Sequence, residues 1–320
     1  MQDVRKSRCH AFAKGTNSNL RTQFRSYFAF CIYFQRRDLP TDLNTLCGHV
    51  QFLSRTLKPP SIRNYLSGVK MLHILLGYEY TFTGDFHLQL TLRGIARLNP
   101  HIPHRARPVT PSILEKFYHF MDKDSHLHWT VYACSLLLFF TMARLGSILP
   151  NSNIQDKKWF LNRDCINFSE EGMLVTLLHT KTIQFGQRRL HIPIIRNNSN
   201  LCPVAAYSKS LEFADTHSKF AFAIPGSKSD VLVGLSKSMF ITIFRDVMTL
   251  AGDEDAMGFT GHSFRRGGAS WAFKVGIPGE LIQVCGDWSS DAYKKYLEFS
   301  MSNKVELAEV FSGSFASHTT

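Results

Sequence analysis

The chain has 320 residues, 44% of them hydrophobic and 19% charged, and its formal net charge is +12. That apolar content excludes a disordered chain, and the length predicts about two domains. The longest apolar stretch stops at Arg144, short of the ~20 residues that span a bilayer, and the N-terminal residues carry no secretory signal.

The positive charge is concentrated in the first third of the chain. Residues 1–105 hold 15 Lys or Arg and 5 Asp or Glu, a net of +10, while the remaining residues have a net of +2. Such a concentration favours a polyanionic partner, although an ordinary basic surface would explain it too. Composition therefore indicates nucleic acid as a partner without establishing it.

The seven cysteines are scattered and form no CxxC pair. This spacing predicts neither a zinc site nor a disulfide framework, and it favours a reducing compartment. The sequence also has no carboxylate cluster with the spacing of metal ligands, so we expect no metal and no cofactor.

Residues 1–105 are predicted to form a helical domain. Apolar residues recur at helical spacing in three stretches, 20–34, 43–53 and 62–76. Thr41 is the expected N-cap of the second of these helices, and Gly77 is the expected stop of the third. A fourth helix is expected at 86–98.

Basic residues share faces on two of these helices. Arg63 and Lys70 are seven residues apart and point the same way on a helix. Arg93 and Arg97 are four residues apart and do the same. A face with two cations can lie along DNA phosphates, although a solvated surface is the alternative for each residue taken alone.

A proline-rich segment, 99–111, separates this domain from the rest of the chain. It holds four prolines together with Arg105 and Arg107, and proline stiffens the backbone and removes amide donors. We therefore expect a linker at about 99–111 between a DNA-binding domain at 1–105 and a second domain at 108–320. The two linker arginines are further candidates for contact with DNA.

The second domain is predicted to be of the α+β class, mostly helical with a small antiparallel sheet. A helix is expected after Thr110, and a buried apolar helix is expected to end near Arg144. The remaining elements are expected as strands at 165–168, 173–180 and 189–194 and as helices at 203–214 and 236–251. From His262 onward the chain looks helical, with breaks at 267–268 and at 276–279.

The most informative segment is 261–268, Gly-His-Ser-Phe-Arg-Arg-Gly-Gly. His262 and Arg265 are three residues apart, so on a helix they point the same way. Trp288 lies 23 residues after Arg265, and Tyr296 lies eight residues further on. Taken singly, the histidine could be a helix cap and the tryptophan a core residue.

Two cations lie upstream of this segment. Arg144 comes at the end of an apolar helix, where an unpaired charge is costly, so we expect it to be paired or functional. Lys181 lies at the tip of the predicted hairpin. Their ordinary alternatives are a cation at a helix C-terminus for Arg144 and a solvated loop residue for Lys181.

The tyrosine recombinases, or phage-integrase family, have an ordered catalytic signature that this chain resembles at Arg144, Lys181, His262, Arg265, Trp288 and Tyr296. The resemblance covers most of the chain, because that family also carries a helical core-binding domain before its catalytic domain. It implies a mostly α chain, with a SAM-like core-binding domain at 1–105 and a catalytic domain of the DNA breaking-rejoining enzyme fold at 108–320. The run from Gly286 to Tyr296, GDWSSDAYKKY, looks closest to the recombinases of DIRS-like retrotransposons.

The resemblance implies an enzyme that cleaves and rejoins DNA strands through a 3′-phosphotyrosyl intermediate in recombination, integration or transposition. The implied roles are a nucleophile in Tyr296, phosphate clamps in Arg144 and Arg265, a general acid in Lys181, an aid to proton transfer in His262 and a hydrogen-bonding or packing support in Trp288. Arg266 is expected to touch another DNA phosphate or solvent. The implied partner is double-stranded DNA, bound by a homotetramer.

Tyr293 competes with Tyr296 for the role of nucleophile, since the two lie on nearly the same helical face. In that family the tyrosine usually follows the preceding Trp or His by eight or nine residues, and Tyr296 follows Trp288 by eight. We therefore assign the nucleophile to Tyr296 and expect Tyr293 to pack inside the domain.

Two positions depart from the family pattern. An acidic residue often stands three positions after the first arginine, but here that residue is Ser147. Gly286 is followed by Asp287 and then Trp288, where a histidine commonly follows the glycine directly. The departures leave open a domesticated, catalytically inactive DNA-binding protein on the same fold. A type IB topoisomerase-like enzyme is a second alternative.

An apolar cluster near the C-terminus is expected to dock on a neighbouring protomer or to fold back onto its own domain. Its residues are Val305, Leu307, Ala308, Val310 and Phe311. For a eukaryotic source the expected location is the nucleus, and for a bacterial source it is the cytoplasm.

Overall fold

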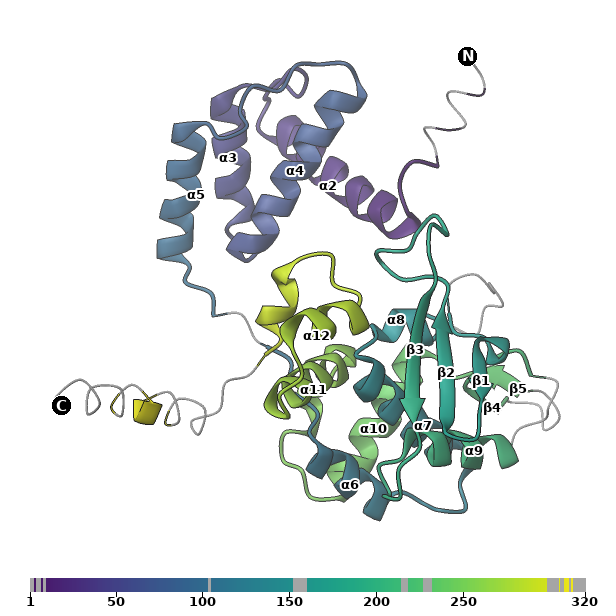
Figure 1. The fold of residues 1–320 in the computed structure, drawn as a ribbon. Helices are drawn as coiled ribbons and strands as arrows, with labels where there is room; N and C mark the ends of the chain where they lie inside the picture. Colours follow the sequence, from purple (N-terminus) through teal and green to yellow (C-terminus); the bar gives the residue numbers. More distant parts are fainter. Residues whose placement is uncertain are drawn as a thin grey trace. The chain divides into compact units, whose positions relative to one another are not determined.

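The computed structural model describes residues 3, 7, 10–102, 105–151, 160–213, 218–226, 232–297, 305, 308–310 and 312. The chain forms two compact units, Met1–His104 and Arg105–Thr320 (Figure 1). The division falls inside the segment expected to be a linker. No helix in the described part of the chain is both long and apolar enough to cross a bilayer.

The first unit is helical, as predicted. Its helices are α2 (Lys14–Tyr33), α3 (Leu43–Leu53), α4 (Pro59–Leu75) and α5 (Phe86–Leu98). The apolar residues at helical spacing form its core, in which Tyr27, Leu46, Val50 and Ile62 are fully buried. Gly77 adopts a left-handed backbone just after α4, which is the helix stop that the sequence predicted.

The prediction that Thr41 caps α3 was wrong. Asp42 is the N-cap, and its carboxylate accepts a hydrogen bond from the Thr45 amide at 2.8 Å. Thr41 instead receives a hydrogen bond from Tyr27 Oη at 2.7 Å and donates its amide to His73 Nε2 at 3.0 Å. A carboxylate caps a helix as well as a hydroxyl does, and its negative charge also suits the positive end of the helix dipole. The observed cap is therefore one residue after the predicted one.

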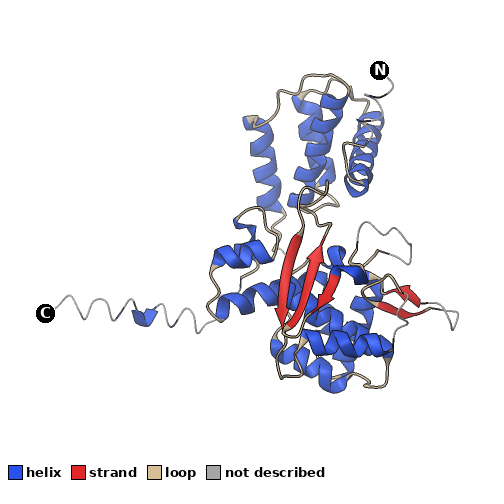
Figure 2. Ribbon diagram, turned by 45° about the vertical axis from the view of Figure 1, so that its right-hand side comes forward, coloured by secondary structure: helices blue, strands red, loops and turns tan. Residues whose placement is uncertain are grey.

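The second unit combines helices with short antiparallel strands (Figure 2). Its helices are α6 (Pro111–Phe120), α7 (His126–Thr141), α8 (Leu145–Ile148), α9 (Pro203–Glu212), α10 (Lys237–Leu250), α11 (Gly261–Lys274) and α12 (Gly279–Cys285), with short 3-10 turns η1 (Arg163–Cys165), η2 (Ala256–Gly258) and η3 (Asp291–Lys295). The strands β1 (Ile166–Phe168), β2 (Gly172–Leu177) and β3 (Leu190–Ile195) form one antiparallel sheet in that order, and β4 (Ala223–Pro225) pairs with β5 (Leu232–Gly234). The predicted fold class is thus confirmed.

The sheet follows the alternation expected of strands with one face buried. Val175 of β2 lies between Ile166 of β1 and Ile192 of β3, and all three side chains are buried. The sequence did not predict β4 and β5, whose three residues each are too few for a periodic pattern. Residue 214, the predicted end of α9, lies outside the described residues.

Helix α7 lies at the centre of the second unit. Eleven of its sixteen residues are buried, so it is covered on all sides, as its uniformly apolar sequence predicted. It ends at Met142, whose backbone is left-handed with φ of 50°. The chain therefore turns sharply and places Arg144 at the N-terminus of α8.

The predicted break at Gly267 and Gly268 was wrong, because α11 runs through both glycines. A Cβ atom on Gly267 would lie 1.7 Å from the Val109 carbonyl oxygen, and one on Gly268 would lie 2.0 Å from the Phe139 carbonyl oxygen. Gly268 thus allows α11 to pack directly against the backbone of α7, and Gly267 allows it to pack against the backbone at Val109, just before α6. The second predicted break is confirmed, since α11 ends before Gly276, whose φ is +84°.

Gly268→Ala is expected to lower the stability of the second unit by about 1–3 kcal/mol, because the new methyl group cannot fit between α11 and α7. Gly94→Ala on α5 is the matched control, since a Cβ there meets nothing within 4 Å. Gly94→Ala is expected to raise the stability of the first unit by about 0.5–1 kcal/mol. Thermal unfolding followed by circular dichroism measures both. An unchanged Gly268→Ala transition would contradict the close packing.

Candidate active site

Arg265 lies on the first turns of α11 and is the most deeply buried cation of the predicted set. Its side chain is 1% exposed, and Nη1 donates a hydrogen bond to the Met142 carbonyl at the end of α7. Its guanidinium carbon lies 3.6 Å from the centroid of the Trp288 ring, which is a cation–π contact. Nε and Nη2 have no hydrogen-bond partner among the described residues.

Unsatisfied buried donors are uncommon in proteins and point to a missing partner. Burial and the nearby charge of Arg144 lower the pKa of Arg265, while Tyr296 and Asp287 oppose that shift. Arg265 therefore has buried donors that are not fully satisfied, and it lies beside the charge of Arg144. An anion such as a phosphate is the partner that would satisfy both conditions.

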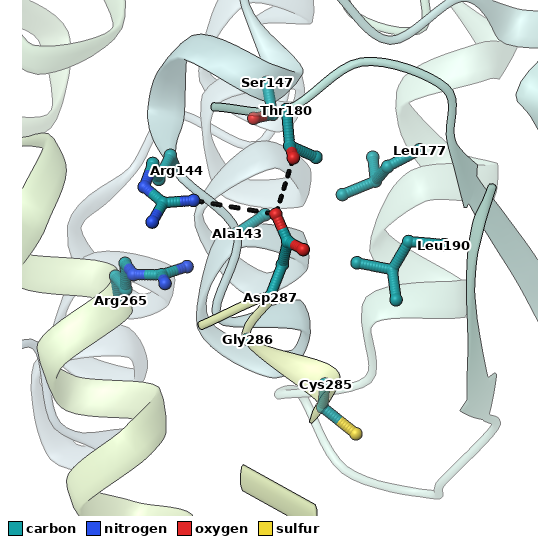
Figure 3. A pocket seen from close by; sticks show the side chains of 10 residues that line it. All are labelled: Ala143, Arg144, Ser147, Leu177, Thr180, Leu190, Arg265, Cys285, Gly286 and Asp287. Atoms are coloured by element: carbon teal, nitrogen blue, oxygen red, sulfur yellow. Dashed lines mark hydrogen bonds and ion pairs between the residues drawn. The ribbon is translucent and has the colours of Figure 1, made fainter. Parts of the chain in front are cut away.

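Arg144 and Arg265 face the same pocket from different elements. Among the residues lining it are Arg144, Ser147, Thr180, Arg265 and Asp287. Figure 3 shows the guanidinium groups of α8 and α11 on one side of the pocket and the carboxylate of Asp287 opposite Arg144. Nη1 of Arg144 lies 3.7 Å from Oδ2 of Asp287.

Tyr296 follows η3 and faces the residues of this site. Its ring centroid lies 5.4 Å from that of Trp288, 6.3 Å from that of His262 and 5.6 Å from the guanidinium carbon of Arg265. Ser270 Oγ on α11 donates a hydrogen bond to the Tyr296 carbonyl at 2.9 Å. The backbone at position 296 is thus tied to the helix that carries His262 and Arg265.

Tyr293 is placed differently. It is 7% exposed, and its hydroxyl lies 2.4 Å from the position that a Cβ on Gly279 would take, so it packs against the start of α12. Its ring centroid is 6.3 Å from that of Trp288, but neither His262 nor Arg265 has a described ring or cation–π contact with it. The arrangement agrees with the assignment of Tyr296, and not Tyr293, to the site.

His262 is the second residue of α11 and is exposed. Partial burial lowers the pKa of its imidazole, and the charges of Arg265, Arg144 and Lys181 lower that pKa further. Three of the predicted cations therefore act on this ring from separate segments of the chain. The shift keeps the ring neutral near pH 7, which allows it to accept a proton.

Lys181 lies in the loop between β2 and β3, as predicted, and its side chain is exposed. Thr180 and Thr182 on either side of it are fixed by side-chain contacts with Asp287. The backbone at Lys181 is therefore held near the site, while its side chain is exposed.

Trp288 is 6% exposed and packs between Arg265, Gly286 and Tyr296. A Cβ on Gly286 would lie 1.6 Å from Cζ3 of Trp288, so only glycine allows the ring this position. The indole nitrogen has no hydrogen-bond partner among the described residues. Of its two predicted roles, the structure displays the packing contact.

Sequence reasoning noticed Asp287 only as a departure from a pattern, and it did not single out Arg188 at all. Asp287 is 5% exposed and forms ion pairs with both Arg144 and Arg188. The one signal in the sequence that could have pointed to Asp287 was Ser147, which stands where an acidic residue is expected and leaves Arg144 without a carboxylate partner on α8.

Four of the predicted DNA-binding residues lie on the helices of the first unit. Arg63, Arg93 and Arg97 are exposed, Lys70 is partly exposed, and Arg63 donates a hydrogen bond to Gln89 at 3.3 Å. Arg105, in the second unit, is also exposed. These side chains are accessible to a polyanion, and their contact with DNA stays a prediction.

Two other residues predicted to contact DNA, Arg107 and Arg266, have less accessible side chains. Arg107 forms an ion pair with Asp253, and its guanidinium carbon lies 4.6 Å from the ring centroid of Phe259, so its charge is already used within the domain. Arg266 is 7% exposed. Their contact with DNA stays a prediction.

Within the described residues no group of three or more His, Cys, Asp or Glu side chains could hold a metal ion. The C-terminal apolar cluster lies partly outside the described residues, which include Val305, Ala308 and Val310 but not Leu307 and Phe311.

No protein-family model matches the chain. The chain is 24% identical over 249 residues to an integrase/recombinase XerD homolog of Selenomonas ruminantium, which covers 76% of this chain and 69% of that protein. The integrase of transposon Tn1549, in complex with circular intermediate DNA, has a TM-score of 0.59 at 14% identity and covers 95% of this chain and 97% of its own. The XerH site-specific recombinase in a post-cleavage complex with a palindromic difH substrate has a TM-score of 0.55 at 12% identity, covering 91% and 77%.

Arg144→Gln is expected to raise the pKa of His262, because it removes one of the cations that disfavour the charged imidazole. Arg63→Gln, on α4 of the other unit, is the control and should leave that pKa unchanged. Histidine ring NMR resonances, with His262 assigned through His262→Gln, measure the titration. A pKa that stays the same or falls in Arg144→Gln would contradict the arrangement.

The same shift has a consequence for stability. Because folding lowers this pKa below the ordinary value of 6.5, the unfolded chain binds more protons on the acid side. The contribution of His262 to stability is therefore complete above pH 6.5 and is lost as the pH falls through the folded pKa.

Proposed function

We propose that this chain, which has the fold of the tyrosine recombinases and resembles them in sequence, cleaves and rejoins DNA strands through a covalent bond to Tyr296. The observation that carries the proposal is that Arg144 and Arg265 line one pocket and that the Tyr296 ring centroid lies 5.6 Å from the guanidinium carbon of Arg265. These residues come from three segments of the chain that are far apart in sequence. A common task at one phosphate explains why they are gathered.

The two arginines would bind the non-bridging oxygens of the scissile phosphate. Forked guanidinium donors match a pair of phosphate oxygens, and preformed cations are most effective where charge develops in the transition state. The free Nε and Nη2 of Arg265 supply one such fork. By binding the non-bridging oxygens, Arg144 and Arg265 would hold the phosphate in place and leave its phosphorus accessible to the Tyr296 oxygen.

The Tyr296 oxygen would then attack phosphorus, form a 3′-phosphotyrosyl bond and release the 5′-oxygen of the next nucleotide. Lys181 would protonate that leaving oxygen as general acid, and neutral His262 would assist in moving the tyrosine proton. Trp288 would hold the Arg265 guanidinium in place through their ring contact. Attack by a free 5′-hydroxyl reverses the steps and joins the strands, so no external energy source is required.

The proposed substrate is double-stranded DNA. The excess positive charge of residues 1–105 and the exposed Arg63, Arg93 and Arg97 support this. So do the structure of the Tn1549 integrase in complex with circular intermediate DNA and that of XerH bound to a palindromic difH substrate. A homotetramer on DNA, a place in the nucleus of a eukaryotic host or in a bacterial cytoplasm, and the DIRS-like affiliation are parts of the proposal that rest on sequence resemblance alone.

The two alternatives can be told apart by activity. A DNA-binding protein without catalysis would bind DNA and form no adduct. A type IB topoisomerase-like enzyme would relax supercoiled plasmid without requiring a site. The presence of every predicted catalytic residue in the sequence supports strand cleavage over the first, and the separate basic helical unit supports recombination over the second.

The experiment uses nicked duplexes with a randomised central segment, which trap the covalent complex by releasing the short cleaved strand. The wild-type chain is expected to form adducts that survive denaturation, and sequencing of the trapped DNA identifies the preferred duplex. Tyr296→Phe is expected to form none, because it lacks the attacking oxygen.

Tyr293→Phe is the matched control, since it removes the hydroxyl that packs against α12 and is expected to keep adduct formation. The proposed function fails if the wild-type chain forms no adduct. The assignment of the nucleophile fails if Tyr296→Phe still forms one or if Tyr293→Phe does not.

A further inference from the structure

Arg144 lacks the acidic neighbour that would be expected on its own helix. The residue three positions on is Ser147, a buried side chain without charge on the same short helix, α8. The Ser147 amide donates to the Arg144 carbonyl at 2.8 Å, so this turn is regular and the difference lies in the side chain. A guanidinium that must be aimed at a phosphate needs some other group to orient it.

Asp287 provides a carboxylate at the same pocket from a different part of the chain. Its Oδ2 lies 3.7 Å from Nη1 of Arg144, and both Asp287 and Ser147 line the pocket (Figure 3). The side chain is 5% exposed, so its interaction with Arg144 is screened less by solvent than a surface ion pair would be.

The backbone fixes the direction of this carboxylate. Asp287 follows the C-terminus of α12 and has a φ of 56°, a conformation that aspartate tolerates better than most residues other than glycine. Its amide donates to the Val284 carbonyl at 3.1 Å, and the Trp288 amide donates to the Gln283 carbonyl at 3.0 Å. This turn sends Asp287 toward Arg144 and Trp288 toward Arg265.

The same carboxylate also holds the loop that carries Lys181. Oδ2 accepts hydrogen bonds from Thr180 Oγ1, at 2.5 Å, and from Thr182 Oγ1. Oδ1 accepts from Nη2 of Arg188 at the far end of the loop. The two residues that flank Lys181 are therefore fixed to the group that is paired with Arg144.

We propose that Asp287 is the positioning residue of the site: it orients Arg144 and anchors the Lys181 loop, in place of the carboxylate that Ser147 does not supply. This proposal rests on the proposed function, since positioning has meaning for a phosphate that reacts there. Asp287 does not touch the phosphate, and it acts through Arg144, Thr180 and Thr182.

The test relocates the carboxylate. Asp287→Asn keeps the size of the side chain and removes its charge, and it is expected to slow adduct formation about 10- to 100-fold on the duplex selected by the wild-type chain, with little change in affinity for that duplex. Adding Ser147→Asp returns a carboxylate to Arg144 from α8 and is expected to recover a large part of the lost rate. A role in stability alone would not be rescued in this way.

Asp253→Asn is the matched control. It also removes a carboxylate paired with an arginine of the second unit, Arg107, but it lies outside the pocket and should keep the wild-type rate. A wild-type rate in Asp287→Asn would overturn the proposal. So would a folded double variant that is as slow as Asp287→Asn alone.

A second measurement does not depend on catalysis. Asp287→Asn is expected to speed hydrogen exchange in the loop 178–189, detected by mass spectrometry, and Asp253→Asn is expected to leave it unchanged. Unchanged exchange in Asp287→Asn would overturn the anchoring. A wild-type chain that forms no adduct would instead refute the proposed function, while the exchange measurement still tests the anchoring, so the two failures are distinguishable.

Thr182→Val keeps the test possible where Asp287→Asn fails to fold. It removes one donor to the carboxylate and leaves the charges of the site unchanged. It is expected to speed exchange in the same loop and to slow adduct formation, because Lys181 is then less well placed. A variant with wild-type exchange and wild-type rate would overturn the anchoring.

Discussion

Repulsion between cations is the constraint on which this site depends. Arg144 and Arg265 face one pocket, and the charges of both and of Lys181 act on His262. Bringing like charges together in a partly buried place costs free energy. Burial is the largest cause of the lowered pKa values of Arg265 and His262, and the neighbouring cations lower both values further. A bound phosphate would offset that cost, so the site is built to prefer an anion. Before an anion arrives, Asp287 and the ring of Trp288 are the groups that steady the arginines.

The backbone holds this arrangement through close packing and two unusual turns. Gly268 allows α11 to lie against α7 closely enough for Arg265 to reach the Met142 carbonyl, and Gly267 admits the backbone at Val109. Left-handed backbone at Met142 and at Asp287 then directs Arg144 and the Asp287 carboxylate into the same pocket. The chemistry thus rests on positions where the main chain leaves regular helix, directly beside helices that are rigidly packed.

Much of the fold was predictable because helices and strands follow from the local spacing of apolar residues. Helix α5 has apolar residues at helical spacing, of which Leu88, Leu92 and Ile95 are buried, and the sequence of α7 is almost uniformly apolar. The sequence could not predict that α11 continues through Gly267, because a glycine that ends a helix and one that admits a neighbouring backbone look the same in sequence. The cap at Asp42 moved by a single residue because two capping side chains stand next to each other.

The site shows a similar limit. The order of Arg144, His262, Arg265 and Tyr296 could be recognised along the chain, but the partner of Arg144 could not. Thr180 and Asp287 are 107 residues apart, and their hydrogen bond depends on how a loop and a helix end meet in space. For the same reason the sequence did not reveal that Arg107 is paired with Asp253, 146 residues away.

The most direct test of this account is a structure of Tyr296→Phe bound, uncleaved, to the duplex that the wild-type chain selects. The account predicts that Arg144 and Arg265 both donate hydrogen bonds to non-bridging oxygens of one phosphate, and that the ring at position 296 lies beside that phosphate. A phosphate held by only one of the two arginines, or one that lies next to Tyr293, would contradict it.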